Sequence, residues 1–152
     1  MHHQLLHDDG AKTWAVVLDT GDEVTACLLD FAKANQLEAT HLSAIGAFER
    51  AVLGYFDWQS KSYQRNPVAS QCEVVSLLGD IARSDGQPKL HMHAVLGLAD
   101  GRALGGHLLE GHVRPTLEVI VTETPAHLRR RHDPVSGLAL IDLPASTVRN
   151  PS

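Results

Sequence analysis

Short β-branched runs separated by turn residues dominate this 152-residue sequence, and only one segment has clear helical periodicity. Helical segments do not alternate regularly with these runs, as they would in a chain of parallel βαβ units. The sequence therefore predicts an α+β fold with a largely antiparallel central sheet and one main amphipathic helix. The strand-like segments span residues 13–19, 40–45, 48–56, 72–78, 90–98, 103–109, 116–122 and 138–143.

The helical segment directly follows the first predicted strand. Residues Thr20 to Glu23 match a capping box, in which the Thr20 hydroxyl accepts from the Glu23 amide and the Glu23 carboxylate reaches back. We expect the helix to end near Asn35. Its apolar face is predicted to consist of Val24, Cys27, Leu28 and Phe31.

Length and composition indicate one domain over residues 1–152, with a core at about 13–143 and flexible ends. No apolar run approaches the roughly 20 residues of a membrane span. Met1 to Gly10 lacks the basic and apolar regions of a secretory signal. Cys27 and Cys72 have no C-x-x-C partner, so we expect reduced thiols in a core. These features predict a cytoplasmic protein without membrane contact.

Three histidines fall on two neighbouring predicted strands. His91 and His93 are two residues apart, so their side chains project from the same face. A three-residue loop of residues 99–101 would set His93 directly opposite His107. A two-residue Asp100-Gly101 loop would instead turn His107 to the other face, unless a bulge at Gly105-Gly106 restores it.

Three converging imidazoles would supply three nitrogen ligands and leave one tetrahedral position open, as in zinc sites that bind water or a further ligand. We therefore predict a site for Zn²⁺, or for another divalent transition metal, at His91, His93 and His107. Glu118 and Glu110 are the predicted second-shell carboxylates that would orient an imidazole. A cupin site also uses H-x-H, but residues 94–99 contain no carboxylate, so that class is set aside.

The formal net charge of −5 argues against general electrostatic binding to nucleic acid. The one basic run, Arg129, Arg130 and Arg131, is interpreted as a solvated face or an interface, with nucleic-acid contact as the alternative. Nucleophile-elbow, zincin and phosphate-loop motifs are missing from the sequence.

Five segments carry a recognisable pattern in their order and spacing: residues 42–48, 53–56, 73–79, 90–93 and 105–108. Together they resemble the plants-and-prokaryotes-conserved (PPC) domain family, in the stand-alone prokaryotic form without an AT-hook. The resemblance implies a compact α+β domain, a homotrimer and a metal ion at His91, His93 and His107. Some family members are named as DNA-binding, although the recognised DNA contact of plant members comes from the AT-hook.

Two functional hypotheses follow. The first is a trimeric, metal-binding interaction or regulatory module with a DNA or protein partner. The alternative is a small zinc-dependent enzyme whose open coordination position activates water or polarises a carbonyl, with Glu118 as the base. The first is favoured because no nucleophile and base, or acid and base, accompany the histidines at a persuasive spacing.

Overall fold

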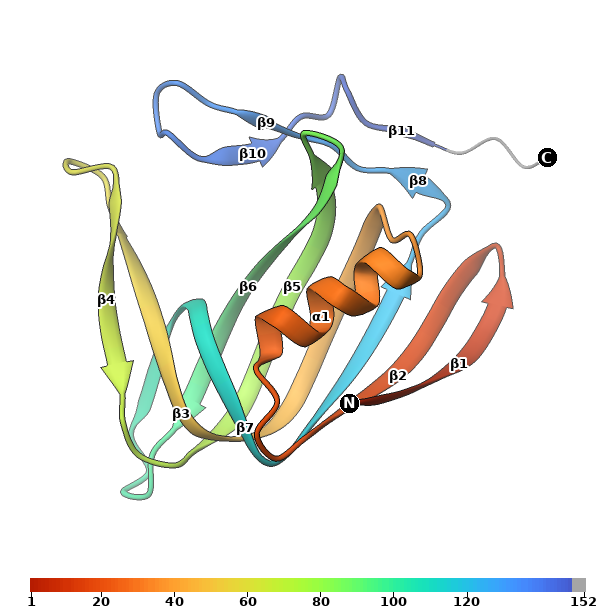
Figure 1. Cartoon of the computed structure of the whole chain (residues 1–152). Helices are drawn as coiled ribbons and strands as arrows, with labels where there is room; N and C mark the ends of the chain where they lie inside the picture. The colour runs from red at the N-terminus through yellow and green to blue at the C-terminus, as the bar shows by residue number, and fades with distance from the viewer. Residues whose placement is uncertain (149–152) are drawn as a thin grey trace.

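The computed structural model describes residues 1–148 (Figure 1). Within these residues, none of the helices is long and apolar enough to cross a membrane. The elements are β1 (His2–Asp9), β2 (Ala11–Asp19), α1 (Val24–Ala34), β3 (Ala39–Asp57), β4 (Ser62–Val68), β5 (Cys72–Ser84), β6 (Gln87–Gly97), β7 (Ala103–Glu123), β8 (Ala126–His127), β9 (Arg130–His132), β10 (Ala139–Ile141) and β11 (Thr147–Val148).

The main sheet has seven strands in the order β1-β2-β7-β6-β5-β3-β4, and β7 also pairs with β3. The strands β7, β6, β5 and β3 therefore form a closed circuit. All ladders of this sheet are antiparallel. The prediction of a mostly antiparallel sheet with one helix is confirmed for residues 1–148.

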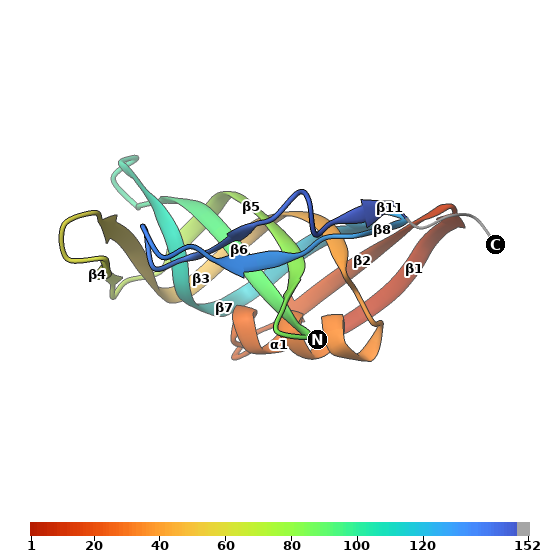
Figure 2. The ribbon, with the colours of Figure 1, turned by 90° about the horizontal axis from the view of Figure 1, so that it is seen from above.

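Helix α1 covers one face of this sheet, where it buries Val24, Leu28 and Phe31 (Figures 1 and 2). The helix is capped at Asn35, as predicted. The predicted capping box is wrong, because Glu23 is itself the N-cap and its carboxylate accepts from the Ala26 amide at 2.8 Å. The Thr20 hydroxyl instead donates to the Pro115 carbonyl of β7 at 3.0 Å.

Strand β3 is one long strand where the sequence predicted two, and it bends at Gly46. The register with β5 shifts between Ala44 and Gly46, which marks a bulge. Gly46 has φ 152°, and a Cβ at this position would lie 2.3 Å from the Thr116 carbonyl oxygen. The bend therefore depends on a residue without a side chain, which lets β7 approach closely.

Two outer strands were not predicted. Every residue of β1 is exposed, and only Val68 of β4 is buried. Neither strand shows the alternation that marks a half-buried strand, because neither has a face in the core. Strand β1 also occupies a part of the chain for which a flexible end was expected.

Residues 126–148, here called the C-terminal arm, lie along one end of the main sheet (Figure 1). The arm contains the two-stranded pairs β9–β10 and β8–β11 and passes over β5 and β6 when viewed from above (Figure 2). The last predicted strand corresponds to β10. Glu38, the residue before β3, anchors the arm, because its carboxylate pairs with His127 and Arg129 as well as with Arg83 of β5.

Candidate metal centre

The register of the β6–β7 hairpin sets His93 directly opposite His107. Gly97 pairs with Ala103, and the Leu98 amide donates to the Arg102 carbonyl at 2.8 Å, so the loop contains residues 99–101. Gly101 takes the left-handed conformation, with φ 83°. The three-residue loop is confirmed, and the two-residue alternative is excluded.

His91, His93 and His107 converge on one point of this hairpin. Each offers a ring nitrogen, and the three nitrogens all lie within 4.8 Å of one another. The ring centroids are 5.1 to 5.3 Å apart. Tyr63 of β4 stacks on His107 from outside the hairpin, with a centroid distance of 4.8 Å.

Burial, together with the neighbouring histidines, lowers the pKa of two of these imidazoles. Desolvation, followed by the neighbouring charges of His91 and His93, lowers the pKa of His107 to about 4. Desolvation and the charge of His91 also lower the pKa of His93. A neutral imidazole is the form that binds metal. His107 Nδ1 is moreover buried without a hydrogen-bond partner, so the residues present fit a transition metal ion.

The two carboxylates predicted to orient an imidazole, Glu110 and Glu118, make other contacts. Glu110 forms an ion pair with Arg65, and Glu118 lies much further along β7, opposite Ile45. The carboxylate beside the histidines is Asp80 of β5, whose Oδ2 is 3.7 Å from His91 Nδ1. The sequence analysis missed Asp80, although a two-residue Asp85-Gly86 turn places it opposite His91.

Asp80 connects the histidines to the C-terminal arm. Its Oδ1 accepts from Arg130 Nη2 at 2.6 Å, and the same Nη2 lies 3.5 Å from His91 Nδ1. Burial raises the pKa of Asp80, but hydrogen bonds from His91 and Arg130 outweigh burial and lower the pKa overall. Asp80 is therefore ionised at neutral pH.

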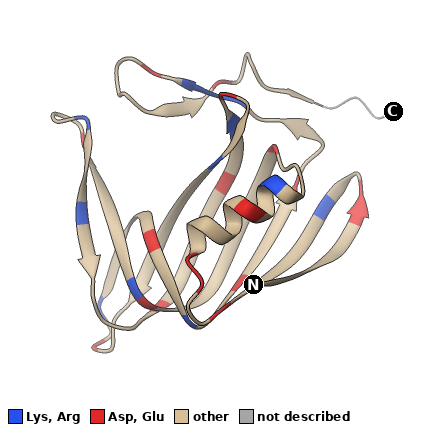
Figure 3. Ribbon diagram, in the orientation of Figure 1, with Lys and Arg blue, Asp and Glu red and all other residues tan. Residues whose placement is uncertain are grey.

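The three arginines of the basic run contact three different carboxylates. Arg129 pairs with Glu38, Arg130 with Asp80, and Arg131 with Asp142. The Arg130 side chain is only 6% exposed. Figure 3 shows acidic and basic residues interspersed over the ribbon. The run therefore does not present three unpaired guanidinium groups on one surface.

A cavity of about 170 Å³ is lined by two of the histidines on one side and by the C-terminal arm on the other. Its walls combine two ring side chains of the cluster with basic, aromatic and apolar groups. They include His91, His107, Tyr63, Lys89, Arg130 and Leu140.

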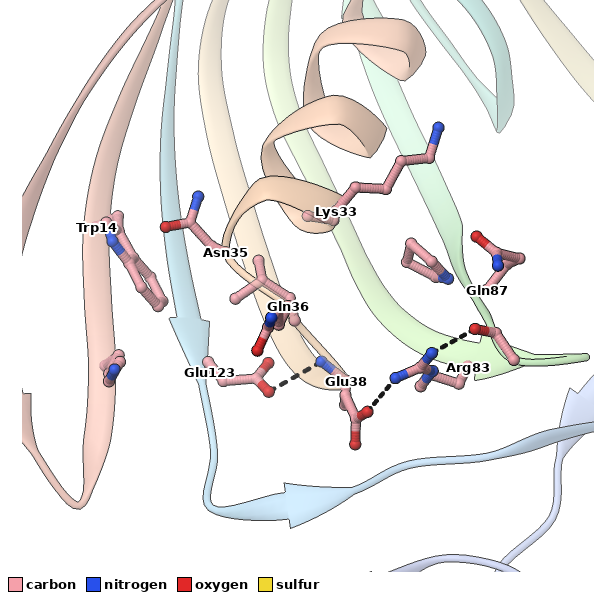
Figure 4. Close-up of a pocket in the computed structure, with 13 residues that line it drawn as sticks. Trp14, Lys33, Asn35, Gln36, Glu38, Arg83, Gln87 and Glu123 are labelled. Atoms are coloured by element: carbon pink, nitrogen blue, oxygen red, sulfur yellow. Dashed lines mark hydrogen bonds and ion pairs between the residues drawn. The ribbon is translucent and has the colours of Figure 1, made fainter.

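A second and larger cavity, of about 700 Å³, lies where the end of α1 meets the β5–β6 turn (Figure 4). Its two carboxylates hold the fold together. Glu123 accepts from the Glu38 and Ala39 amides and from the Thr40 hydroxyl at 2.6 to 3.1 Å. Glu38 in turn pairs with Arg83. These groups join β7, β3 and β5 and are separate from the histidine cluster.

The fold and this cluster define a class of small antiparallel α+β proteins with a candidate three-histidine metal centre. Residues 7–125 match the family model of the Plants and Prokaryotes Conserved (PCC) domain. The chain belongs to this family, as the resemblance of its sequence segments predicted.

Several solved structures are similar over nearly the whole chain. A plant- and prokaryote-conserved protein of Pyrococcus horikoshii is 29% identical, with a TM-score of 0.81 and coverage of 93% of this chain and 94% of the other. A "putative DNA binding protein" of Bacteroides thetaiotaomicron is 25% identical (TM-score 0.84; coverage 93% and 98%). A "metal-containing protein" of Archaeoglobus fulgidus is 30% identical (TM-score 0.80; coverage 93% and 98%).

The chain also resembles part of a longer curated protein. It is 28% identical over 137 residues to the bifunctional protein GlmU of Synechococcus sp. (strain JA-3-3Ab). The match covers 88% of this chain but 21% of the relative, so the chain spans about a fifth of that protein's length.

Proposed function

We propose that this protein is a metal-binding module that holds a divalent transition metal ion, zinc in the first place, through His91, His93 and His107. The observation that carries the proposal is the convergence of three ring nitrogens within 4.8 Å of one another. Imidazole ligands favour zinc, nickel, copper or iron over calcium and magnesium. The metal-containing relative from Archaeoglobus fulgidus supports the same reading.

Asp80 is the carboxylate best placed to orient the centre. It faces His91 across the β5–β6 ladder, and Arg130 fixes its orientation. Carboxylates behind metal-bound histidines set the ring orientation and raise ligand basicity. Glu110 is paired with Arg65, so in this proposal Asp80 is the carboxylate that orients the His91 ring.

Self-association as a homotrimer is the second part of the proposal. Four apolar side chains are 45 to 62% exposed on one face of β3, β5 and β7 and share a shallow hollow. Contiguous exposed apolar surface of this kind marks interaction sites. The four side chains are Ile45, Val75, Leu78 and Ile120.

The alternative is a small metal-dependent enzyme, favoured by the cavity beside His91 and His107. An enzyme would also need a base at the open metal position. Asp80 is held by Arg130, and Glu118 lies far along β7, so the binding module remains the main proposal. DNA association rests on the names of relatives, and the arginines 129–131 proposed to mediate it are paired with carboxylates.

The metal content of the purified, untagged protein tests the centre. We expect close to one equivalent of zinc per chain by mass spectrometry, lost in His93→Ala and His107→Ala. His41→Ala is the matched control, because His41 is an exposed histidine of β3 outside the cluster. Wild-type protein without metal after zinc addition, or metal retained in both cluster variants, would refute the proposal.

A further inference from the structure

The C-terminal arm lies beyond residues 7–125, where the family match ends, and yet it forms one wall of the cavity at the histidines. We propose that the arm makes this cavity a pocket for a small carboxylate anion, bound at the open position of the metal and held by Arg130. This inference rests on the proposed metal function and specifies the ligand of the same centre.

Charge favours an anion. A divalent ion on three neutral imidazoles keeps its two positive charges, and Lys89 and Arg130 add positive charge to the walls. Among the described residues that line the cavity there is no acidic side chain. Asp80 neutralises part of this charge from behind, where it pairs with Arg130. The cavity thus remains positive once the metal is present.

Arg130 is built into the wall. Its side chain is 94% removed from solvent, since only 6% is exposed, and Asp80 and the Ala139 carbonyl fix the two terminal nitrogens. The remaining nitrogen, Nε, is buried without a hydrogen-bond partner. A buried donor without an acceptor is unfavourable, and an anion in the adjoining cavity would relieve this cost.

The size and polarity of the cavity select among anions. A water molecule occupies roughly 30 Å³ of liquid volume, so about 170 Å³ admits a body of a few carbon atoms. Leu90, Leu138 and Leu140 supply apolar walls, and Tyr63 adds an aromatic ring. An inorganic phosphate would leave these walls without a partner, whereas a short carboxylate would fill them.

Calorimetric titration of the zinc-loaded, full-length protein tests the inference with butyrate, its neutral analogue butyramide, and inorganic phosphate. We expect butyrate to bind at least tenfold more tightly than either of the others, and chelation of the zinc to abolish its binding. Arg130→Gln should weaken butyrate binding about ten- to a hundredfold. Arg131→Gln, on the same strand but paired with Asp142, is the matched control and should stay within twofold.

Arg130→Gln also removes an anchor of the arm, so a second variant at an exposed position is needed. Lys89→Met should weaken butyrate binding about threefold, with the thermal stability of the protein unchanged. Unchanged affinity in Lys89→Met, equal loss in Arg130→Gln and Arg131→Gln, or binding that persists without zinc would overturn the inference.

The two proposals fail differently. If the wild-type protein binds no zinc, both the proposed metal function and this inference are refuted. If zinc is bound through the histidines but butyrate binds no more tightly than butyramide or phosphate, only the carboxylate pocket is refuted.

Discussion

Tyr63 lies over the imidazole of His107, with ring planes 29° apart and centroids separated by 4.8 Å. The tyrosine belongs to β4, which pairs only with β3 in the main sheet, whereas His107 belongs to β7. One ligand of the candidate metal centre is therefore held from outside the hairpin that carries all three histidines.

We expect Tyr63→Leu to lower zinc affinity about tenfold, because the His107 ring loses the contact that orients it. Competition with a chromophoric chelator would measure this change. Tyr63→Phe keeps the stacked ring and should bind zinc like wild type. Equal affinity in Tyr63→Leu and Tyr63→Phe would show that the stack does not position the ligand.

Gly101→Ala should destabilise the protein by about 1 kcal/mol in urea denaturation, with zinc stoichiometry unchanged. The cost is conformational, because Gly101 has φ 83° and an added Cβ would have no neighbour within 4 Å. Gly105→Ala is the control on the same hairpin, since its Cβ would meet only ordinary contacts beginning at 3.7 Å. A Gly105→Ala loss as large as that of Gly101→Ala would contradict this explanation.

The carboxylate of Glu38 should make stability depend on acid pH. Burial raises the pKa of Glu38, but hydrogen bonds from His127 and Arg83 outweigh burial and lower it to about 2, from 4.5. A lowered folded-state pKa stabilises the protein above the unfolded value, and this contribution is lost as the pH falls from about 4.5 towards 2.

Glu38→Gln should therefore be less stable than wild type by about 2 kcal/mol at pH 7, with the difference shrinking towards pH 2. Urea denaturation across this pH range would measure both curves. Glu49→Gln provides the comparison, because Glu49 forms a more exposed pair with Arg114. A constant difference between Glu38→Gln and wild type at every pH would rule out this source of acid sensitivity.

Leu78→Glu should convert a homotrimer to a monomer, because the new charge lies in the exposed apolar face of β3, β5 and β7. Size-exclusion chromatography with light scattering would give the mass. Leu143→Glu places the same charge at an exposed leucine of the C-terminal arm and should leave the trimer intact. A wild-type monomer would refute the trimer itself.

The sequence was most informative where local turn chemistry determines register. Ala99, Asp100 and Gly101 form a loop whose geometry alone sets His93 opposite His107, so this part of the site could be predicted. The same reasoning applied to Asp85-Gly86 would have found Asp80. The capping box failed because Glu23 is the N-cap and the Thr20 hydroxyl contacts the Pro115 carbonyl of β7 instead, a contact between distant segments that local pattern does not encode.

Arg130 shows why the rest of the site could not be predicted from the sequence. Its neighbours Asp80 and His91 lie on β5 and β6, and their contact depends on how the C-terminal arm folds back over the sheet. Nothing in the Arg129 to Arg131 run indicates that its middle member would be buried. Likewise, β4 is nearly all exposed, so Tyr63 had no hydrophobic alternation to mark it as part of a strand.

The closed circuit of β7, β6, β5 and β3 has a consequence for how the chain is made. Strand β7 is the last of the four to leave the ribosome, and its ladder with β3 joins residues as distant as Thr40 and Glu123. Pairings between such distant residues form slowly, and unpaired strand edges invite association with other chains. Until β7 has been synthesised, the nascent protein exposes the edges of β3 and β6, and association with other chains is most favourable in this interval.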